Sequence, residues 1–504
     1  MGSRPRGEPG TRVLPRGTSH RSTINAAYRS QQPPHLLRWA AHGPSLCARG
    51  DARLTLAIRV GGRTALHTSL HFPRVHPSPL QSSLHGTSKL QMPPSNAGKA
   101  EEDLSTRLLH ADHHLVARPE VAPAISVSTT FRAPSPAEIL AAAPGHYTTD
   151  WDPSIPSRDI YSRYTQPVLT QAEAVLSAII GQPTIAYPSG IAATFAILLY
   201  ILPDVIAITD GYHGCHASIE VYRKTRGEDR VSVIKLDDAY PKDKKLLVWL
   251  ETPLNPTGEC RSIEAYAQKA HAARGTMVVD STFAPPPLQD PFKWGADIVM
   301  HSGTKYFGGH SDLLCGTVSV KDKQSWLNLW HNRTYTGSNE GSLESWLLLR
   351  SLRTLEVRVT RQAKTATALA QWLASLTRAA PNSSLDGPSG VVFHVFHVSL
   401  QKDAKDFVGE GRQMTIGSAC FAFMTTKESY AVHLGHALRL FVPATSLGSV
   451  ESLIEQRVMS DPGSDPRLLR LSIGLEDFDD LKRDLIEGFN KVLAIEIGLT
   501  SSKL

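Results

Sequence analysis

Cysteine is scarce in this chain. The 504 residues include five cysteines, at irregular spacing and without a C-x-x-C pair. This pattern excludes a disulfide framework and a cysteine-based metal site, and it is typical of a reducing compartment. The contents of 41% hydrophobic and 20% charged residues are those of a globular protein. The length is sufficient for two or three domains.

Acidic residues are almost absent from the first 99 positions. This segment has 14 Lys or Arg and 11 of the 34 prolines, but only Glu8 and Asp51 as acids. The remaining residues carry 39 Lys or Arg against 45 Asp or Glu, so the body is mildly acidic although the whole chain has a net charge of +6. This balance disfavours nucleic acid as a partner. We expect residues 1–99 to be a disordered basic leader, either a transit peptide or an extension ahead of a start at Met92.

An uninterrupted hydrophobic run of membrane-spanning length is also missing. The segment Ile191–Ile208 is apolar over about the length that a bilayer needs, but Pro203 and Asp204 interrupt it. We therefore expect a helix followed by a buried strand, and no membrane partner.

From about residue 165 the pattern alternates between helices and strands. A helix is predicted over 167–180, with its apolar positions on one face and its end at Gly181. The apolar runs that follow predict strands buried on both faces, and hence a mostly parallel α/β sheet. These runs are 184–188, 205–210, 231–236, 246–253, 277–282, 296–302 and 313–320. A long amphipathic helix from near Leu343 leads to strands around 391–400 and 419–426, which predict an α+β domain.

Four segments are therefore expected. They are the leader at 1–99, an N-terminal arm at 100–165, a large cofactor-binding domain at 166–356 and a small C-terminal domain at 357–504.

Lys305 has the setting of a reactive lysine. It directly follows a predicted strand and the small residues Ser302 and Thr304. A partly desolvated lysine at such a position can form a Schiff base, and the two hydroxyls can hold a phosphate beside it.

Other strand ends carry residues that suit the same cofactor. Asp280 ends a strand, where its carboxylate can pair with a pyridinium nitrogen. The segment Ser189-Gly190-Ile191 spans a strand-to-helix junction, whose free N–H groups can hold phosphate. Tyr212 follows another strand and offers a ring for stacking. Together with Lys305, these positions predict a pyridoxal-phosphate site. No metal is expected, because His213, Cys215 and His216 have no second cluster to complete a ligand set.

Eight motifs, in order, make the chain similar to the Cys/Met-metabolism (trans-sulfuration) pyridoxal-phosphate enzymes. That family includes cystathionine γ-synthase, cystathionine β-lyase, cystathionine γ-lyase and methionine γ-lyase. The resemblance runs from Leu104 to about Ile497 and implies fold type I. The motifs are STTF (128–131), YSRYTQP (161–167), SGIAAT (189–194), ETPLNPTG (251–258), VDSTFA (279–284), SGTKYFGGHSD (302–312), TSLGSVESLIE (445–455) and LLRLSIGLED (468–477).

The resemblance implies roles toward the cofactor, pyridoxal 5′-phosphate. Lys305 holds it covalently and moves protons, and Tyr212 stacks on the ring and takes part in proton exchange. Asp280 keeps the pyridine nitrogen protonated, and Asn255 contacts the phenolic oxygen. The implied phosphate ligands are Ser189, Gly190, Ile191, Ser302 and Thr304, with Tyr161 and Arg163 reaching it from a neighbouring subunit.

Toward the substrate, the resemblance implies that Arg470 grips the α-carboxylate, with Ser446 and Asn255 beside it. The chain is then expected to form a homodimer with shared active sites, and a homotetramer. Among the departures from the family pattern, two lie in the C-terminal part of the chain. Thr445 stands where several cystathionine-handling members have a glutamate, and residues 457–469 lack a His-Pro…Thr-His pattern.

The implied reaction is chemistry at the C–S bond of a sulfur amino acid, as in a cystathionine lyase or cystathionine γ-synthase. The alternatives are a methionine γ-lyase or an O-acyl-homoserine sulfhydrylase-like activity. An alternative of another class is a catalytically reduced family member with a binding or regulatory role.

The chain ends in Ser502-Lys503-Leu504. A terminal S-K-L is read by the peroxisomal import receptor, so we expect a peroxisomal location. The alternatives are the cytoplasm, or the mitochondrion if the leader is a transit peptide.

Overall fold

The computed structural model describes residues 102–116, 120–141, 152–153, 156, 158–377 and 387–496. The chain divides into two units, residues 1–92 and 93–504, and all described residues belong to the second. The predicted leader and Ser502-Lys503-Leu504 lie outside the described residues. The helices are α1 (Leu104–His110), α2 (Pro136–Ala141), α3 (Pro167–Ile180), α4 (Gly190–Ile201), α5 (His213–Arg226), α6 (Ile263–Ala272), α7 (Lys323–Thr336), α8 (Ser342–Leu352), α9 (Leu355–Leu376), α10 (Ala404–Phe407), α11 (Glu428–Ala437) and α12 (Phe478–Glu496).

The larger sheet has seven strands in the order β1-β7-β6-β5-β4-β2-β3. Neighbouring strands from β3 to β6 are parallel, and β7 is antiparallel to both β6 and β1. The predicted α/β architecture with a mostly parallel sheet is thus confirmed. The strands are β1 (Thr184–Tyr187), β2 (Val205–Ala207), β3 (Ser232–Ile234), β4 (Leu246–Glu251), β5 (Thr276–Asp280), β6 (Ile298–His301) and β7 (Gly316–Val320).

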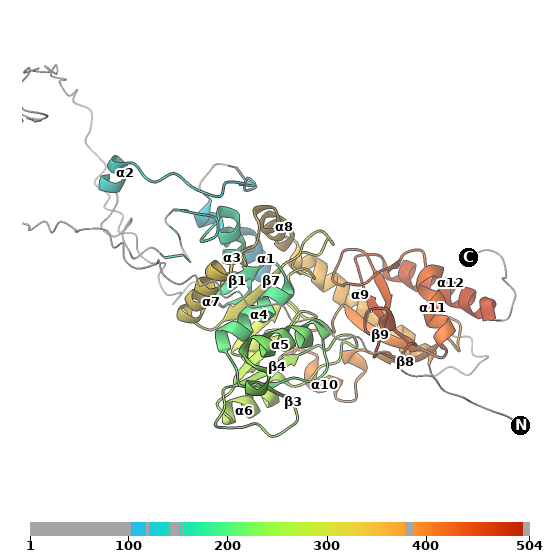
Figure 1. Ribbon diagram of the computed structural model, residues 1–504. Helices are drawn as coiled ribbons and strands as arrows, with labels where there is room; N and C mark the ends of the chain where they lie inside the picture. Colours follow the sequence, from blue (N-terminus) through green and yellow to red (C-terminus); the bar gives the residue numbers. More distant parts are fainter. Residues whose placement is uncertain are drawn as a thin grey trace, which may run out of the picture. The chain divides into compact units, whose positions relative to one another are not determined.

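Central strands of this sheet are buried on both faces, as their apolar composition predicted. Leu247 and Val278 pack with α4 and α5 on one face, whereas Val248 and Val279 pack with α6 on the other (Figure 1). This period of two puts every second residue of a strand under a helix layer. The segment 231–236 was wrongly expected to be buried on both faces: β3 lies at the sheet edge, and Val233 is 40% exposed.

The smaller sheet has the order β10-β11-β12-β9-β8 and packs with α9 and α11. The pair β10–β11 is parallel and the other pairs are antiparallel, which agrees with the predicted α+β character. The boundaries expected at 165 and 356 stay predictions, because residues 93–504 form one compact unit. The strands are β8 (Val392–Phe396), β9 (Cys420–Thr425), β10 (Val442–Pro443), β11 (Leu453–Gln456) and β12 (Leu468–Ser472).

Two expectations about helices have different outcomes. The prediction of a single long helix from Leu343 is wrong, because α8 and α9 are separated at Arg353 and Thr354. The side chain of Arg358 compensates the break by donating to the Ser351 carbonyl at 2.8 Å and to Thr354 Oγ1 at 3.0 Å. The run Ile191–Ile208 does divide into α4 and β2. Within the described ranges, no helix is long and apolar enough to cross a membrane.

Candidate active site

Three neighbouring parallel strands bring the main candidates to one edge. Glu251 ends β4, Asp280 ends β5, and Lys305 lies in the turn after β6. Because carboxyl ends of parallel strands meet at the same edge, these residues share the place where α/β sheets bind ligands. Glu251 and Asp280 are direct register partners.

Asp280 is a buried carboxylate with few polar neighbours. It is 5% exposed and accepts hydrogen bonds from the Thr282 N–H at 3.0 Å and the Thr282 hydroxyl at 2.6 Å. Burial raises the pKa of Asp280, against the effect of these hydrogen bonds. Thr282 also accepts a hydrogen bond from the Ser302 N–H at 2.8 Å, which connects the acid to the lysine turn. A protonated pyridine nitrogen would place an opposite charge beside this carboxylate.

Glu251 is a site residue that the sequence reasoning missed. Its two carboxylate oxygens accept the backbone N–H groups of Tyr212 at 2.7 Å and Asn255 at 2.8 Å. It thereby fixes the two residues predicted to flank the cofactor ring. Burial raises the pKa of Glu251, and the neighbouring Asp280 raises it further. The signal was present, because Glu251 is a strand-end carboxylate inside the ETPLNPTG motif, as Asp280 is inside VDSTFA.

Lys305 is partly desolvated, as predicted for a reactive amine. Its Nζ donates to the Ser446 hydroxyl at 3.0 Å. Burial lowers the pKa of Lys305 to about 8, and the charge of Arg470 acts in the same direction. Near neutral pH the amine is thus far more available as a base than a solvated lysine.

Arg470 lies within the same site, on β12. Its guanidinium donates to Asn255 Oδ1 at 3.0 Å and to the Ser446 carbonyl at 2.9 Å. It also forms an ion pair of 2.6 Å with Glu455. At 5% exposure, this arginine is nearly removed from solvent.

The start of α4 forms a cradle suited to phosphate. Ser189 caps the helix by accepting the Ala192 N–H at 3.1 Å, and the first-turn N–H groups of Gly190 and Ile191 have no acceptor inside the helix. A Cβ at Gly190 would come within 2.9 Å of Ser302 Oγ. Glycine therefore lets Ser302 approach the helix end, as the predicted phosphate ligands require.

The ring of Tyr212 lies close to this cradle. A Cβ on Gly214 would collide with that ring and would be 3.0 Å from Ile191. Tyr212 is 41% exposed, which leaves a face of the ring for contact with a flat ligand. Burial raises the pKa of its phenol and Cys215 adds to the effect, whereas Arg457 and Arg470 lower it.

Thr304 has a different contact from the one expected. Its hydroxyl donates to the Cys315 carbonyl at 3.2 Å and accepts the Cys315 N–H at 2.9 Å. A hydroxyl has one hydrogen to donate, so Thr304 would have to release Cys315 to donate to a phosphate. Its phosphate role stays a prediction.

Tyr161 and Arg163 have contacts that are separate from those of Lys305. The Arg163 guanidinium lies 5.5 Å from the ring centre of Tyr161 and 5.0 Å from that of Tyr164, and it donates to the Thr334 carbonyl at 3.3 Å. Tyr161 is 41% exposed. Within the described residues, no hydrogen bond or ion pair connects this pair to Lys305, so its role in a neighbour's site stays a prediction.

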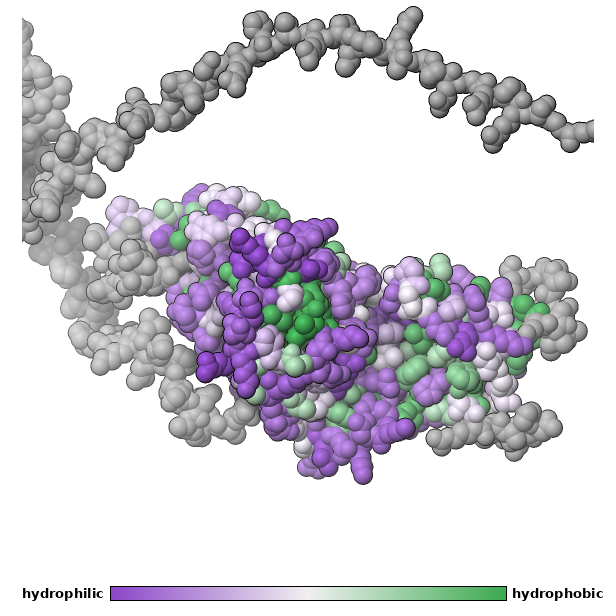
Figure 2. All heavy atoms as spheres, turned by 60° about the horizontal axis from the view of Figure 1, so that its bottom comes forward, coloured by the Kyte–Doolittle hydropathy of each residue, from purple (hydrophilic) through white to green (hydrophobic). Residues whose placement is uncertain are grey.

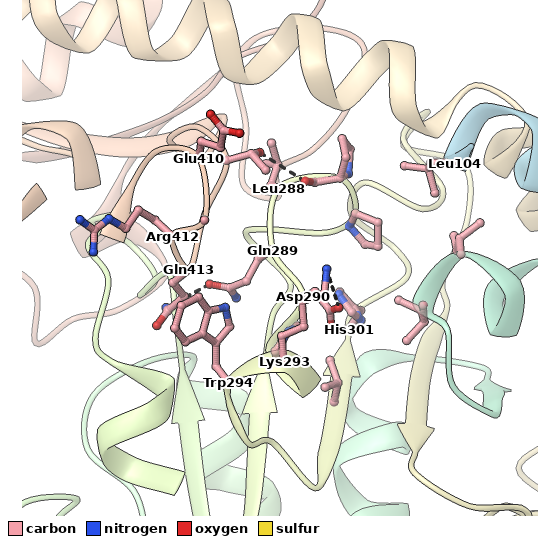
Figure 3. Close-up of a pocket in the computed structure, with 18 of the residues that line it drawn as sticks. Leu104, Leu288, Gln289, Asp290, Lys293, Trp294, His301, Glu410, Arg412 and Gln413 are labelled. Carbon is pink, nitrogen blue, oxygen red and sulfur yellow. Dashed lines mark hydrogen bonds and ion pairs between the residues drawn. The ribbon is translucent and has the colours of Figure 1, made fainter. Parts of the chain in front are cut away.

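A separate cavity of about 700 Å³ lies outside this site (Figure 3). Its walls include His301, Trp294 and residues 409–413, but none of the predicted site residues. Both ring nitrogens of His301 are buried, without a hydrogen-bond partner among the described residues, and burial lowers its pKa to about 3. In the same part of the chain, no group of three His, Cys, Asp or Glu is arranged to hold a metal.

Comparison with known proteins identifies the class. Residues 105–490 match the family model described as Cys/Met metabolism PLP-dependent enzyme. The chain is 31% identical to cystathionine gamma-lyase of Saccharomyces cerevisiae over 406 residues, which cover 76% of this chain and 96% of that protein. It is 29% identical to chloroplastic cystathionine beta-lyase of Arabidopsis thaliana over 77% of this chain and 81% of that protein. Its structure is similar to that of CalE6, a methionine gamma lyase from Micromonospora echinospora, with a TM-score of 0.63, 29% identity and coverage of 77% and 99%.

These matches define a PLP-dependent enzyme of fold type I that acts at carbon–sulfur bonds. The chain belongs to the Cys/Met metabolism PLP-dependent enzymes, the trans-sulfuration family. The residues present fit the cofactor: a phosphate cradle at Gly190 and Ser302, a buried acid at Asp280 and a desolvated amine at Lys305.

Proposed function

We propose that this chain cleaves or forms the C–S bond of cystathionine, as a cystathionine lyase or cystathionine γ-synthase. The observation that carries the proposal is that Asp280 and the half-buried Lys305 lie at one edge of the large sheet, and that Arg470 of the small sheet shares the partner Ser446 with this lysine. When bound, pyridoxal 5′-phosphate withdraws electrons from the substrate's Cα. The names of the yeast and plant relatives support cystathionine as the substrate.

Different residues of this chain would bind different parts of that cofactor. Gly190, Ile191 and Ser302 would hold its phosphate, Asp280 its pyridine nitrogen and Asn255 its phenolic oxygen. Lys305 would hold the cofactor covalently until the substrate's amino group displaces it, and the freed amine would then take the proton from the substrate's Cα, a step that its lowered pKa favours.

Arg470 and its neighbours would orient the substrate. The guanidinium would bind the α-carboxylate, while Asn255 Oδ1 and the Ser446 carbonyl keep its plane fixed. The Tyr212 ring, held at its backbone by Glu251, would cover the cofactor and accept or return a proton near the leaving sulfur.

The chain is also proposed to assemble into oligomers. Members of this family act on amino acids and are oligomeric. Figure 2 shows an apolar area bordered by hydrophilic residues, a pattern typical of protein contacts. The proposed assembly is a homodimer in which Tyr161 and Arg163 reach the neighbour's phosphate, with two dimers forming a tetramer.

The proposed location is the peroxisome, through recognition of Ser502-Lys503-Leu504 by the import receptor. A reporter fused to the N-terminus should collect in peroxisomes and disperse when these three residues are deleted. A diffuse signal from the intact fusion would contradict this location.

Methionine γ-lyase activity is the second candidate. Thr445 offers no carboxylate for the distal ammonium of cystathionine, and the similar protein CalE6 is described as a methionine gamma lyase in one structure and as a cystathione gamma lyase in another. Parallel assays of cystathionine, methionine, cysteine, and O-acyl-homoserine with cysteine would separate the candidates. Lys305→Ala should remove turnover and the cofactor's visible absorbance from a folded protein; wild-type turnover in this variant would refute the proposal.

A further inference from the structure

A second buried arginine stands behind the predicted carboxylate-binding residue. Glu455 on β11 and Arg470 on β12 are register partners, and Arg457 follows β11 directly. Glu455 Oε2 lies 2.6 Å from Arg470 and 2.9 Å from Arg457, so one carboxylate oxygen is shared by two guanidinium groups. The exposed fractions are 7% for Glu455 and 5% for each arginine.

The cluster is charged and carries an excess of one positive charge. Burial works to raise the pKa of Glu455, but Arg470, Ser460 and Arg457 together bring it below its ordinary value, so the carboxylate is ionised at neutral pH. Two arginines against one glutamate leave one net positive charge. A buried charge without a counter-ion is costly, and a single carboxylate entering the site would neutralise this one.

The contribution of Arg457 follows from the charges that would remain in the cluster without it. Glu455 would then face Arg470 alone, and the pair would be neutral before any substrate arrived. An incoming α-carboxylate would then find no net positive charge in the cluster to attract it. With Arg457 present, Glu455 can hold the Arg470 guanidinium in place without cancelling its attraction for an anion.

We propose that Arg457 is a positioning residue that balances the charge of Glu455, so that Arg470 retains its affinity for the substrate's α-carboxylate. The proposal rests on the proposed function in one respect, that the substrate is an α-amino acid. It also gives a role to the first residue of the 457–469 stretch, in which the chain departs from the family pattern.

The test is a titration of the holoenzyme with L-alanine, which has the α-carboxylate but no leaving group, followed by the cofactor's visible absorbance. Ethylamine, which lacks the carboxylate, is the matched ligand. In Arg457→Gln, the dissociation constant for L-alanine should rise at least about tenfold, the size expected when one charge near an anion is lost in a poorly solvated site. The dissociation constant for ethylamine should stay within about twofold of the wild-type value.

A charge-restoring variant separates balance from packing. Glu455→Gln with Arg457→Gln returns the cluster to one net positive charge and should recover most of the L-alanine affinity. Arg457→Lys should also keep it, and this variant serves if Arg457→Gln does not fold. The proposal is overturned if Arg457→Gln binds L-alanine with the wild-type dissociation constant, or if its affinity for ethylamine falls by the same factor as its affinity for L-alanine. It is also overturned if the double variant binds L-alanine as weakly as Arg457→Gln does, or if Arg457→Lys binds L-alanine tenfold more weakly than the wild type. If the wild-type enzyme does not respond to L-alanine at all, the proposed function fails instead.

Discussion

Ser446 holds Lys305 with its side chain and Arg470 with its backbone. Its hydroxyl accepts from Lys305 Nζ at 3.0 Å, and its carbonyl accepts from Arg470 at 2.9 Å. The φ angle of Ser446 is +88°, in the left-handed region, so the residue is kept in a strained conformation in which it reaches both partners. Two residues later, Gly448 packs against the backbone of Lys305 and Tyr306. The segment before β11 therefore fixes the lysine at both ends.

Substitutions at Ser446 should separate strain from hydrogen bonding. Ser446→Ala and Ser446→Gly both lose the hydroxyl, and each should lower kcat/KM by about tenfold, the value of one hydrogen bond to a charged group. Only glycine relieves the left-handed backbone, so Ser446→Gly should be about 1 kcal/mol more stable than Ser446→Ala in urea unfolding. Equal stability of the two variants would show that the conformation costs nothing.

The buried amine of Lys305 should make the stability of the cofactor-free protein depend on pH. Its folded pKa, lowered to about 8, is below the unfolded value, so the folded state binds this proton less tightly. The burial penalty is complete below pH 8 and disappears as the pH rises from about 8 to the unfolded lysine value of about 10.4. Lys305→Met should thus be about 1–3 kcal/mol more stable than wild type at pH 7, with a smaller advantage at pH 9.5.

Urea unfolding at pH 7, 8 and 9.5 measures this difference, with Lys364→Met as the control, because Lys364 is exposed on α9. A constant advantage of Lys305→Met across these pH values would mean that the lysine is not desolvated in the folded state.

Sharing of active sites can be tested by mixing inactive variants. Lys305→Ala lacks the amine, and Arg163→Ala lacks the residue predicted to reach the neighbour's phosphate. In a mixed dimer, one site would combine an intact lysine with an intact arginine, so subunit exchange should restore up to about a quarter of wild-type activity if exchange is random. Mass spectrometry of tagged subunits confirms that exchange has taken place. Exchange without recovered activity would place Arg163 in the site of its own chain.

Much of this architecture follows from patterns that a sequence shows directly. The apolar runs gave all seven strands of the large sheet, and the strand-end positions of Asp280 and Lys305 placed them on one edge. Contacts across the fold were not predictable in this way. Ser446 and Lys305 are 141 residues apart, and Asn255 and Arg470 are 215 apart. Their pairing depends on how the strands of the small sheet approach the large one, which no local period encodes.

Residues with two roles were the hardest to predict. Glu251 accepts hydrogen bonds from the backbone of two other residues, and the hydroxyl of Thr304 forms a hydrogen bond with Cys315. Residue type and spacing indicate what a side chain can bind, but not which of several partners it has. Likewise, the break between α8 and α9 depends on Arg358 reaching the Ser351 carbonyl, a contact within an otherwise continuous helical pattern.

Substrate choice should depend on the position before Ser446. Thr445 is exposed, and its neighbour touches both the lysine and, through its carbonyl, the carboxylate-binding arginine. Thr445→Glu adds a carboxylate at the edge of the site, which should favour a substrate with a distal ammonium, such as cystathionine, over methionine. Because an exposed ion pair contributes only about 0–1 kcal/mol, the ratio of the two kcat/KM values should shift by at most about fivefold. Thr445→Gln has the same size without the charge and should leave the ratio unchanged, and high salt should reduce the shift in Thr445→Glu by screening it. If Thr445→Glu changes both kcat/KM values by the same factor, residue 445 does not face the distal group, and its departure from the family pattern has no bearing on cystathionine.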